Sequence, residues 1–167
     1  KSTDIGFADP EDLYYKMKNV YSWDALKRTD YFVDYQNFYT FCGVLSQRNL
    51  FVNVAKEMLK IGDKERAVEM LDMCQECVPV ENFPLDITYL GFSNEYMVID
   101  MIETYYKAGA AEKALELSKR FTDELFVSTE AAQVVPAKHL EDTLKGFQKL
   151  CEERGVNLRT QSMNKTP

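Results

Sequence analysis

The chain has 167 residues, of which 46% are hydrophobic and 28% are charged, and its net charge is −7 at pH 7. This length and apolar content are typical of one globular domain with a sizeable core. The acidic balance argues against nucleic acids and anionic membrane surfaces as partners, because both attract basic patches. No run of about 18 apolar residues occurs, so we expect no direct insertion into a membrane.

Helices are predicted in the N-terminal third of the chain. Asp9-Pro10 marks a helix start, because an Asp side chain caps free N–H groups and Pro fits the first helical position. The apolar residues that follow lie on one face: Leu13, Met17 and Val20. A short helix or turn is predicted around Trp23 and Leu26. A further helix is predicted from Asp34 to Gln47, with three residues facing its neighbours: Phe38, Phe41 and Leu45.

Two stretches of the chain have nearly the same sequence. The segment Lys60–Glu69 matches the segment Lys107–Glu116, with Lys, Gly, Glu, Ala and Glu at the same places 47 residues apart. Each predicts a helix, a turn at a glycine (Gly62 or Gly109) and a second helix, because glycine readily takes the left-handed conformation after a helix. A repeat of this kind is one supersecondary unit, so we predict two antiparallel helical hairpins.

The predicted hairpins span about 48–79 and 95–126. Their first helices carry the same apolar stripe: Leu50, Phe51, Val54, Ala55, Met58 and Leu59 in one, and Met97, Val98, Met101, Ile102, Tyr105 and Tyr106 in the other. Ala67 and Ala114 follow the turns, where the paired helices are expected to approach closest. Pro79 ends the first unit, because proline cannot continue a helix.

This pattern resembles the tetratricopeptide repeat, which combines a small residue, a large residue, a glycine turn, an early alanine and a closing proline. The matching residues are Ala55, Met58, Gly62, Ala67 and Pro79 in the first unit, and Ile102, Tyr105, Gly109 and Ala114 in the second. The second unit departs from the family by its large Ile102 and by lacking a closing proline. The resemblance implies an all-α fold, a right-handed superhelix of antiparallel helical hairpins with flanking helices. A generic helical bundle is the alternative.

The repeats are expected to form one domain over residues 1–155. Because the usual unit is about 34 residues long, the 47-residue offset leaves about 13 extra residues, which we place at 80–93. We expect no regular structure there, only anchoring by Phe83 and Leu85. Pro136 predicts the start of a final helix that ends at Gly155, with its apolar stripe at Leu140, Leu144, Phe147 and Cys151. Residues 156–167 are polar and predicted to be a mobile tail.

A wider resemblance covers most of the chain. It is carried by a series of motifs in one order: Leu13 through Trp23, Tyr31–Asp34, Arg48–Phe51, the two repeats, and Asn82–Asp86. These resemble the soluble C-terminal region of multi-pass membrane proteins of Bacteroidetes, a domain of unknown function related to eukaryotic transmembrane protein O-mannosyltransferases. The resemblance implies that the chain is a fragment of a membrane glycosyltransferase-like protein, on the periplasmic face of the inner membrane. Cys42-Gly43 departs from the family pattern.

Few residues suggest catalysis or metal binding. Cys74 and Cys77 form a Cys-x-x-Cys motif, but it lies within a predicted helix and not at the strand-to-helix junction of redox pairs, which favours packing. A redox or zinc role is the alternative, and zinc needs two more ligands from Cys42, His139 or Cys151. His139 is predicted to lie at the surface. We expect no catalytic residue, no metal and no cofactor.

A binding surface is therefore the candidate functional site. By the resemblance, a groove is lined by outward-facing residues of the two first helices: Asn49, Val52, Asn53, Lys56, Tyr96, Ile99, Asp100 and Glu103. Asparagine offers a donor and an acceptor to an extended peptide backbone. The mixed charges predict no sharp preference for an acidic peptide. The alternative is that these are ordinary surface residues.

We predict a non-catalytic protein-interaction or scaffold domain. Its partner is a protein, a peptide or the membrane part of its own parent chain. One alternative is an accessory domain that stabilises a membrane catalytic core without a ligand of its own. The other is an independent enzyme, which needs a convergent polar pocket. An apolar patch on the outer helices favours docking on a core, whereas a polar groove favours peptide binding.

Overall fold

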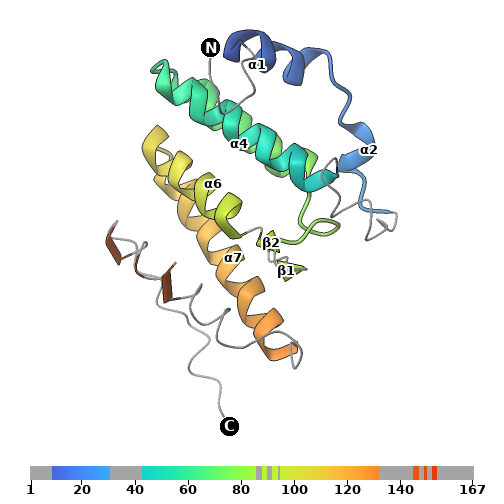
Figure 1. Cartoon of the computed structure of the whole chain (residues 1–167), viewed down its shortest axis with the longest axis vertical. Coiled ribbons are helices and arrows are strands. Elements are labelled where there is room, and N and C mark those ends of the chain that lie inside the picture. Colours follow the sequence, from blue (N-terminus) through green and yellow to red (C-terminus); the bar gives the residue numbers. More distant parts are fainter. Residues whose placement is uncertain are drawn as a thin grey trace.

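The computed structural model describes residues 9–30, 43–85, 88–89, 92–93, 95–131, 145–146, 149 and 152–153. These residues are helical apart from turns and one very short β-hairpin (Figure 1). The predicted helix from Pro136 and the tail at 156–167 lie almost wholly outside the described residues. Most of the helix predicted over 34–47 also lies outside them.

The N-terminal helices form much as the sequence predicts. Helix α1 spans Pro10–Asn19, and the Asp9 side chain accepts hydrogen bonds from the backbone N–H groups of Glu11 (2.9 Å) and Asp12 (3.3 Å). Helix α2 spans Asp24–Lys27. Met17 is fully buried, but Val20 is 61% exposed. The placement of Val20 on the buried face was wrong, because α1 ends at Asn19.

The first hairpin consists of α4 (Val44–Lys60) and α5 (Lys64–Cys77). A helix boundary was predicted after Gln47, but α4 is continuous from Val44, because no glycine or proline interrupts that stretch. Gly43 is the residue before the helix and adopts an extended conformation. Helix α5 ends before Pro79, as predicted.

The second hairpin consists of α6 (Glu95–Ala108) and α7 (Ala111–Ala131). Helix α7 runs beyond the predicted end of the unit at 126. The sequence explains this extension, because no proline or glycine follows until Pro136.

The turns of the two hairpins have the same geometry. Gly62 and Gly109 have φ angles of 86° and 89°, in the left-handed region that glycine adopts easily. The next residue in each turn, Asp63 or Ala110, donates its N–H to a carbonyl of the preceding helix at 2.9 Å. This shared hydrogen bond satisfies a carbonyl that the helix end would leave unpaired, and the predicted glycine turns are confirmed.

The segment between the hairpins contains more structure than the sequence indicated. Phe83 and Leu85 are buried, as expected. Further on, strand β1 (Thr88–Tyr89) pairs antiparallel with strand β2 (Phe92–Ser93). The expectation of no regular structure was wrong here. Strands of two residues are too short to produce a visible alternation of apolar and polar residues.

The core lies between the helices of the two hairpins, and α4 lies beside α6 (Figure 1). The N-terminal helices add to this core through Trp23, whose ring centroid lies 4.8 Å from that of Phe51 in α4.

A polar bridge joins the hairpins. The Tyr105 hydroxyl of α6 donates to Asp72 Oδ1 of α5 at 2.9 Å and accepts from Gln75 Nε2 at 2.8 Å. Lys113 of α7 reaches the other Asp72 oxygen at 2.5 Å. Burial is the main cause that raises the pKa of Tyr105, so the phenol keeps its proton and remains a hydrogen-bond donor.

Ala67 and Ala114 are both fully buried at the starts of α5 and α7. We predict that Ala67→Leu or Ala114→Leu overpacks these helix contacts and lowers the free energy of unfolding by about 1–3 kcal/mol. Urea denaturation measures the effect. The matched control is Ala111→Leu, at an exposed position of α7, which we expect to change stability little. Equal effects at the three positions would contradict close helix pairing.

Candidate interaction surface

Three of the four predicted groove residues of α4 lie on one narrow polar stripe: Asn49, Asn53 and Lys56. Asn49 is exposed, Asn53 and Lys56 are half-buried, and Lys60 is exposed. Their spacing of four, three and four residues keeps them on one helix face, while most other residues of α4 are buried. Lys60 was not predicted, although helical spacing from Asn49 would have found it.

Helix α6 carries the corresponding stripe 47 residues later. Asp100 and Glu103 are half-buried and Lys107 is exposed. The side chain of Tyr96 lies outside what the structure describes. Ile99 is half-buried and packs against the core. The repeat in sequence therefore places polar residues at equivalent positions of both first helices.

An ion pair joins the two stripes. Lys56 Nζ of α4 lies 2.9 Å from Asp100 Oδ2 of α6. This contact brings together two predicted groove residues that are 44 residues apart in sequence. Each side chain is more than a third exposed, so the pair lies at the surface and contributes little to stability.

Val52 was wrongly assigned to the groove. Its side chain is fully buried and belongs to the core. Val52 lies at the edge of the α4 stripe, on the side that also carries the buried Ala55. An apolar residue at such an edge is covered by neighbouring elements, so Val52 is not available to a partner.

The other charges of the stripes are paired along their own helices. Lys60 lies 2.5 Å from Glu57, whose side chain is only 7% exposed, and Lys107 lies 2.8 Å from Glu103. With the Lys56–Asp100 pair, the stripe presents alternating charges that neutralise one another. The surface is therefore suited to hydrogen bonding and not to attraction of a strongly charged ligand.

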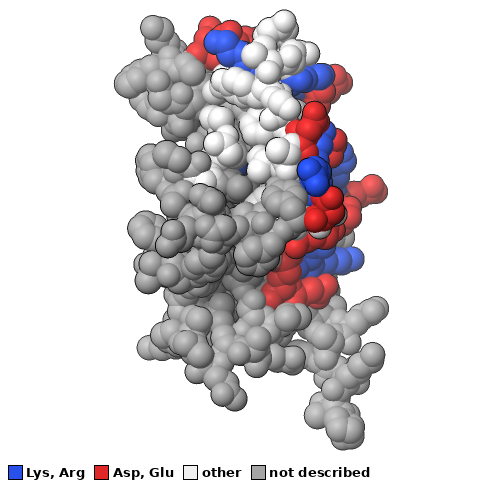
Figure 2. Space-filling view, turned by 90° about the vertical axis from the view of Figure 1, so that its right-hand side faces the viewer, with Lys and Arg blue, Asp and Glu red and all other residues white. Residues whose placement is uncertain are grey.

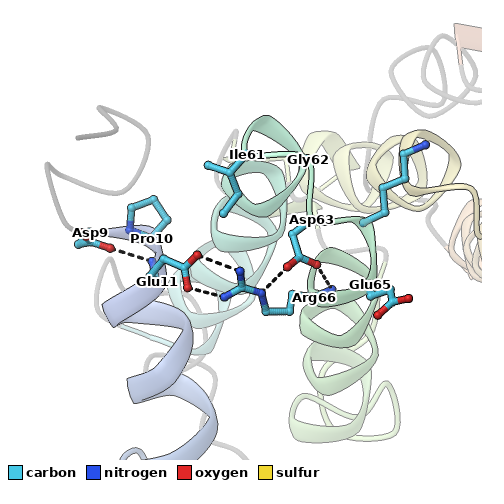
Figure 3. Close-up of a pocket in the computed structure, with 9 residues that line it drawn as sticks. Asp9, Pro10, Glu11, Ile61, Gly62, Asp63, Glu65 and Arg66 are labelled. Carbon is cyan, nitrogen blue, oxygen red and sulfur yellow. Dashed lines mark hydrogen bonds and ion pairs between the residues drawn. The ribbon is translucent and has the colours of Figure 1, made fainter.

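A second candidate is a shallow hollow of about 800 Å³ between the start of α1 and the α4–α5 turn (Figure 3). Within it Arg66 binds Glu11 through two nitrogens, at 2.5 and 2.8 Å, and its Nε lies 2.6 Å from Asp63 Oδ2. The hydrogen bonds from the Arg66 side chain lower the pKa of Glu11, and the backbone N–H of Arg66, followed by its side chain, lowers the pKa of Asp63. Sequence spacing did not reveal this cluster, because Glu11 lies 55 residues from Arg66 in the chain.

Glu11, Asp63 and Arg66 of the hollow bind one another, so their role is to attach α1 to the first hairpin. Asp63 also accepts the backbone N–H of Arg66 at 2.9 Å and thereby caps α5. The Arg66 side chain is therefore fixed by Glu11 of α1 on one side and by Asp63 on the other. We therefore give the hollow no ligand.

The two central cysteines are packing residues. Cys74 and Cys77 are buried free thiols. Burial raises the pKa of Cys74 to about 12 and that of Cys77 to about 11. The thiolate is the reactive form, so both are poor nucleophiles.

Within the described ranges no three His, Cys, Asp or Glu side chains are placed to hold a metal. The other candidate zinc ligands, Cys42, His139 and Cys151, lie outside those ranges.

Arg48 has the largest fully buried side chain among the described residues, and the sequence alone suggested no role for it. Its Nη2 donates to the carbonyl of Phe83 at 2.7 Å and to that of Val78 at 3.4 Å, and Nη1 donates to Pro84 at 3.3 Å. In the sequence, the only indication of this role was an arginine at the start of an apolar helical stretch. The guanidinium attaches the end of α5 and the following loop to α4.

Helix α7 takes part in the same attachment. Glu124 Oε2 accepts the backbone N–H of Leu85 at 2.5 Å, and its negative charge acts on Arg48. Burial lowers the pKa of Arg48, yet an arginine side chain keeps its charge in proteins. The loop at 78–85 is thus held between a cation on α4 and an anion on α7.

No protein-family model, curated protein or solved structure matches the chain. Across the described segments, every helix is too short or too polar to cross a membrane. The geometry of the chain itself is therefore the basis for assigning a function.

We predict that Arg48→Met lowers the free energy of unfolding by about 3 kcal/mol, because it leaves buried carbonyls without a donor. Arg48→Lys is expected to cost less, since it keeps the charge but lacks the planar fork of donors. Chemical denaturation of both variants measures the difference. A Met variant as stable as the original chain would show that these hydrogen bonds contribute nothing.

Acid should weaken the contact between α1 and α5. The pKa values of Glu11, Asp63 and Glu69 are lowered, chiefly by hydrogen bonds from Arg66 or Lys18. Lowered carboxyl pKa values stabilise the fold above the unfolded values of about 4 and lose this effect as the pH falls through the folded values.

We therefore expect the free energy of unfolding to fall below about pH 4. Arg66→Gln should weaken this acid dependence, because it removes the guanidinium that donates to Glu11 and Asp63, while the backbone N–H of residue 66 can still donate to Asp63. Urea denaturation across the acid range compares the two proteins. Identical pH profiles would contradict the assignment of the shifts to Arg66.

Proposed function

We propose that the chain is a non-catalytic protein-interaction domain built from two tetratricopeptide-like hairpins. Its ligand is an extended peptide segment of a partner protein, bound along the stripes of α4 and α6. The binding residues are Asn49, Asn53, Lys56, Ile99, Asp100 and Glu103, with Tyr96 retained from the sequence pattern.

Support for repeat architecture comes from equivalent positions in the two hairpins. Ala67 and Ala114 are both buried early in the second helix, and Met58 and Tyr105 are both buried before the turn. Gly62 and Gly109 have nearly equal positive φ angles. Two units with the same internal geometry stack in the same way, which places their first helices side by side.

The observation that carries the proposal is the pair of polar stripes on adjacent first helices. Lys56 and Asp100 meet at 2.9 Å, so the stripes form one continuous surface. Asn49 is exposed on it and has a donor and an acceptor available for a peptide backbone.

Surface composition favours peptide binding over docking on a membrane core. The exposed large hydrophobic residues of the described chain are Tyr15, Val20, Tyr21 and Ile61. Up to Glu124, the exposed residues of α5 and α7 are mostly charged: Lys64, Glu65, Glu76, Glu112, Lys113, Glu116, Lys119 and Asp123. Figure 2 shows acidic and basic side chains interleaved along one edge of the face it draws. A surface on which acidic and basic side chains are mixed in this way is typical of one that faces water.

The family resemblance adds a cellular setting to the proposal. The domain would be the soluble C-terminal part of a membrane glycosyltransferase-like protein, on the periplasmic side of the inner membrane. Stabilising the membrane core remains the second role proposed for it. A reporter that is active only outside the cytoplasm, fused to the C-terminus of the parent protein, tests the location; a silent reporter would place the domain inside.

Peptide binding is tested with a random peptide library displayed on phage and selected on the intact chain. We expect the Kd of selected peptides to rise about tenfold in the double variant Asn49→Ala, Asn53→Ala, because two hydrogen bonds are lost. The control is Lys119→Ala, at an exposed position of α7, which should leave Kd unchanged. Peptides that bind both variants equally would contradict the assigned surface.

A further inference from the structure

We propose that the segment Asp9–Lys27, containing α1 and α2, is a cap that is oriented by charge and opens as one unit from the first hairpin. While the cap opens, α4 to α7 stay folded. This inference is independent of the proposed peptide site, because it concerns a different face of the first hairpin.

Three charged residues of α5 lie on one helix face and each binds the cap. Arg66 binds Glu11 of α1, Glu69 binds Lys18 of α1, and Glu76 binds Lys27 of α2 at 2.5 Å. The offsets of three and ten residues from Arg66 keep these side chains on the same side of α5. The contacts form a line along α5.

The signs of the charges specify the direction of the cap. Along α5 they run positive, negative, negative, and along the cap they run negative, positive, positive. A cap docked in the reverse direction would place Lys27 beside Arg66 and Glu11 beside Glu76, with like charges together. The arrangement therefore selects one orientation, although each exposed pair alone is weak.

Tyr14 lies in the middle of this line. Its hydroxyl donates to Glu69, and its ring lies 5.2 Å from the Arg66 guanidinium carbon and 5.8 Å from the Lys18 ammonium. The aromatic ring thus contacts cations from both the cap and α5. Polar and cation–π contacts therefore add to the apolar attachment of the cap along α5.

The apolar attachment of the cap is concentrated in two residues. Met17 is fully buried and Trp23 is 8% exposed, whereas Leu13, Tyr14 and Leu26 are only partly buried. The hollow in Figure 3 lies at the seam between the start of α1 and the α4–α5 turn. The seam is therefore less completely packed than the contact between α4 and α5.

The cap has contacts of its own that hold it together. Trp23 Nε1 donates to the carbonyl of Met17 at 2.7 Å, and the rings of Tyr21 and Trp23 meet edge to face at 6.1 Å. These bonds connect α1 to α2 within the cap. Detachment consequently uncovers Phe51 of α4 and the charged row of α5 in one step.

Hydrogen exchange measured by mass spectrometry on the intact chain tests the proposal. Between about 50 mM and about 1 M salt, where screening becomes strong, we expect the α1 amides to exchange about tenfold faster. The buried part of α4 and α5 should change by less than about twofold. Exchange of α1 at the rate of α4 in both salts, or no salt effect on α1, would overturn the proposal.

Charge reversal gives a second measurement. The triple variant Arg66→Glu, Glu69→Lys, Glu76→Lys should speed exchange in α1, and adding Glu11→Arg, Lys18→Glu, Lys27→Glu should restore protection. The control swaps an ion pair elsewhere, Lys56→Asp with Asp100→Lys, and should leave the exchange rate of the α1 amides unchanged.

If the compensating reversal fails to restore protection, orientation by charge is refuted. If the triple variant does not fold, the salt series on the original chain decides.

Discussion

The buried guanidinium of Arg48 is the constraint on which the rest of the fold depends. A charge removed from water is tolerated only where its donors are satisfied, and here the partners are carbonyls of Val78, Phe83 and Pro84. These carbonyls belong to the end of α5 and the next loop. Their position relative to α4 is therefore fixed by hydrogen bonds with defined directions, in addition to apolar contact.

Fixing the end of α5 has consequences for the second hairpin. The same loop leads toward α6, and Glu124 of α7 holds its Leu85 amide. The polar bridge around Tyr105 then attaches α6 and α7 to α5. Because directional bonds act on both sides of α5, α4 and α6 are held next to each other, and the polar stripes become one surface.

The features predicted correctly from sequence are those with local causes. The Asp9 cap, the glycine turns and the buried alanines each depend on residues within one or two helical turns, so spacing alone identified them. The prediction failed where distant residues decide the outcome. Val52 is buried because of what packs on α4, and Arg48 is satisfied by carbonyls that lie at least 30 residues away in sequence. On the candidate surface, helical spacing gave most of the stripe, but the Lys56–Asp100 contact required the packing of two helices.

The anchoring of the loop at 78–85 also bears on how this chain tolerates changes in length. The loop is fixed through Leu85, so residues added to the connection would enlarge only the part that follows. The entropy of closing a flexible connection grows slowly, by about 0.6 kcal/mol for each doubling of its length. The distance between the hairpins along the sequence is thus weakly constrained, whereas their distance in space is set by Arg48, Glu124 and Tyr105. Insertions and deletions are accordingly expected to accumulate between Leu85 and Glu95, outside the paired strands β1 and β2, without displacing one hairpin from the other.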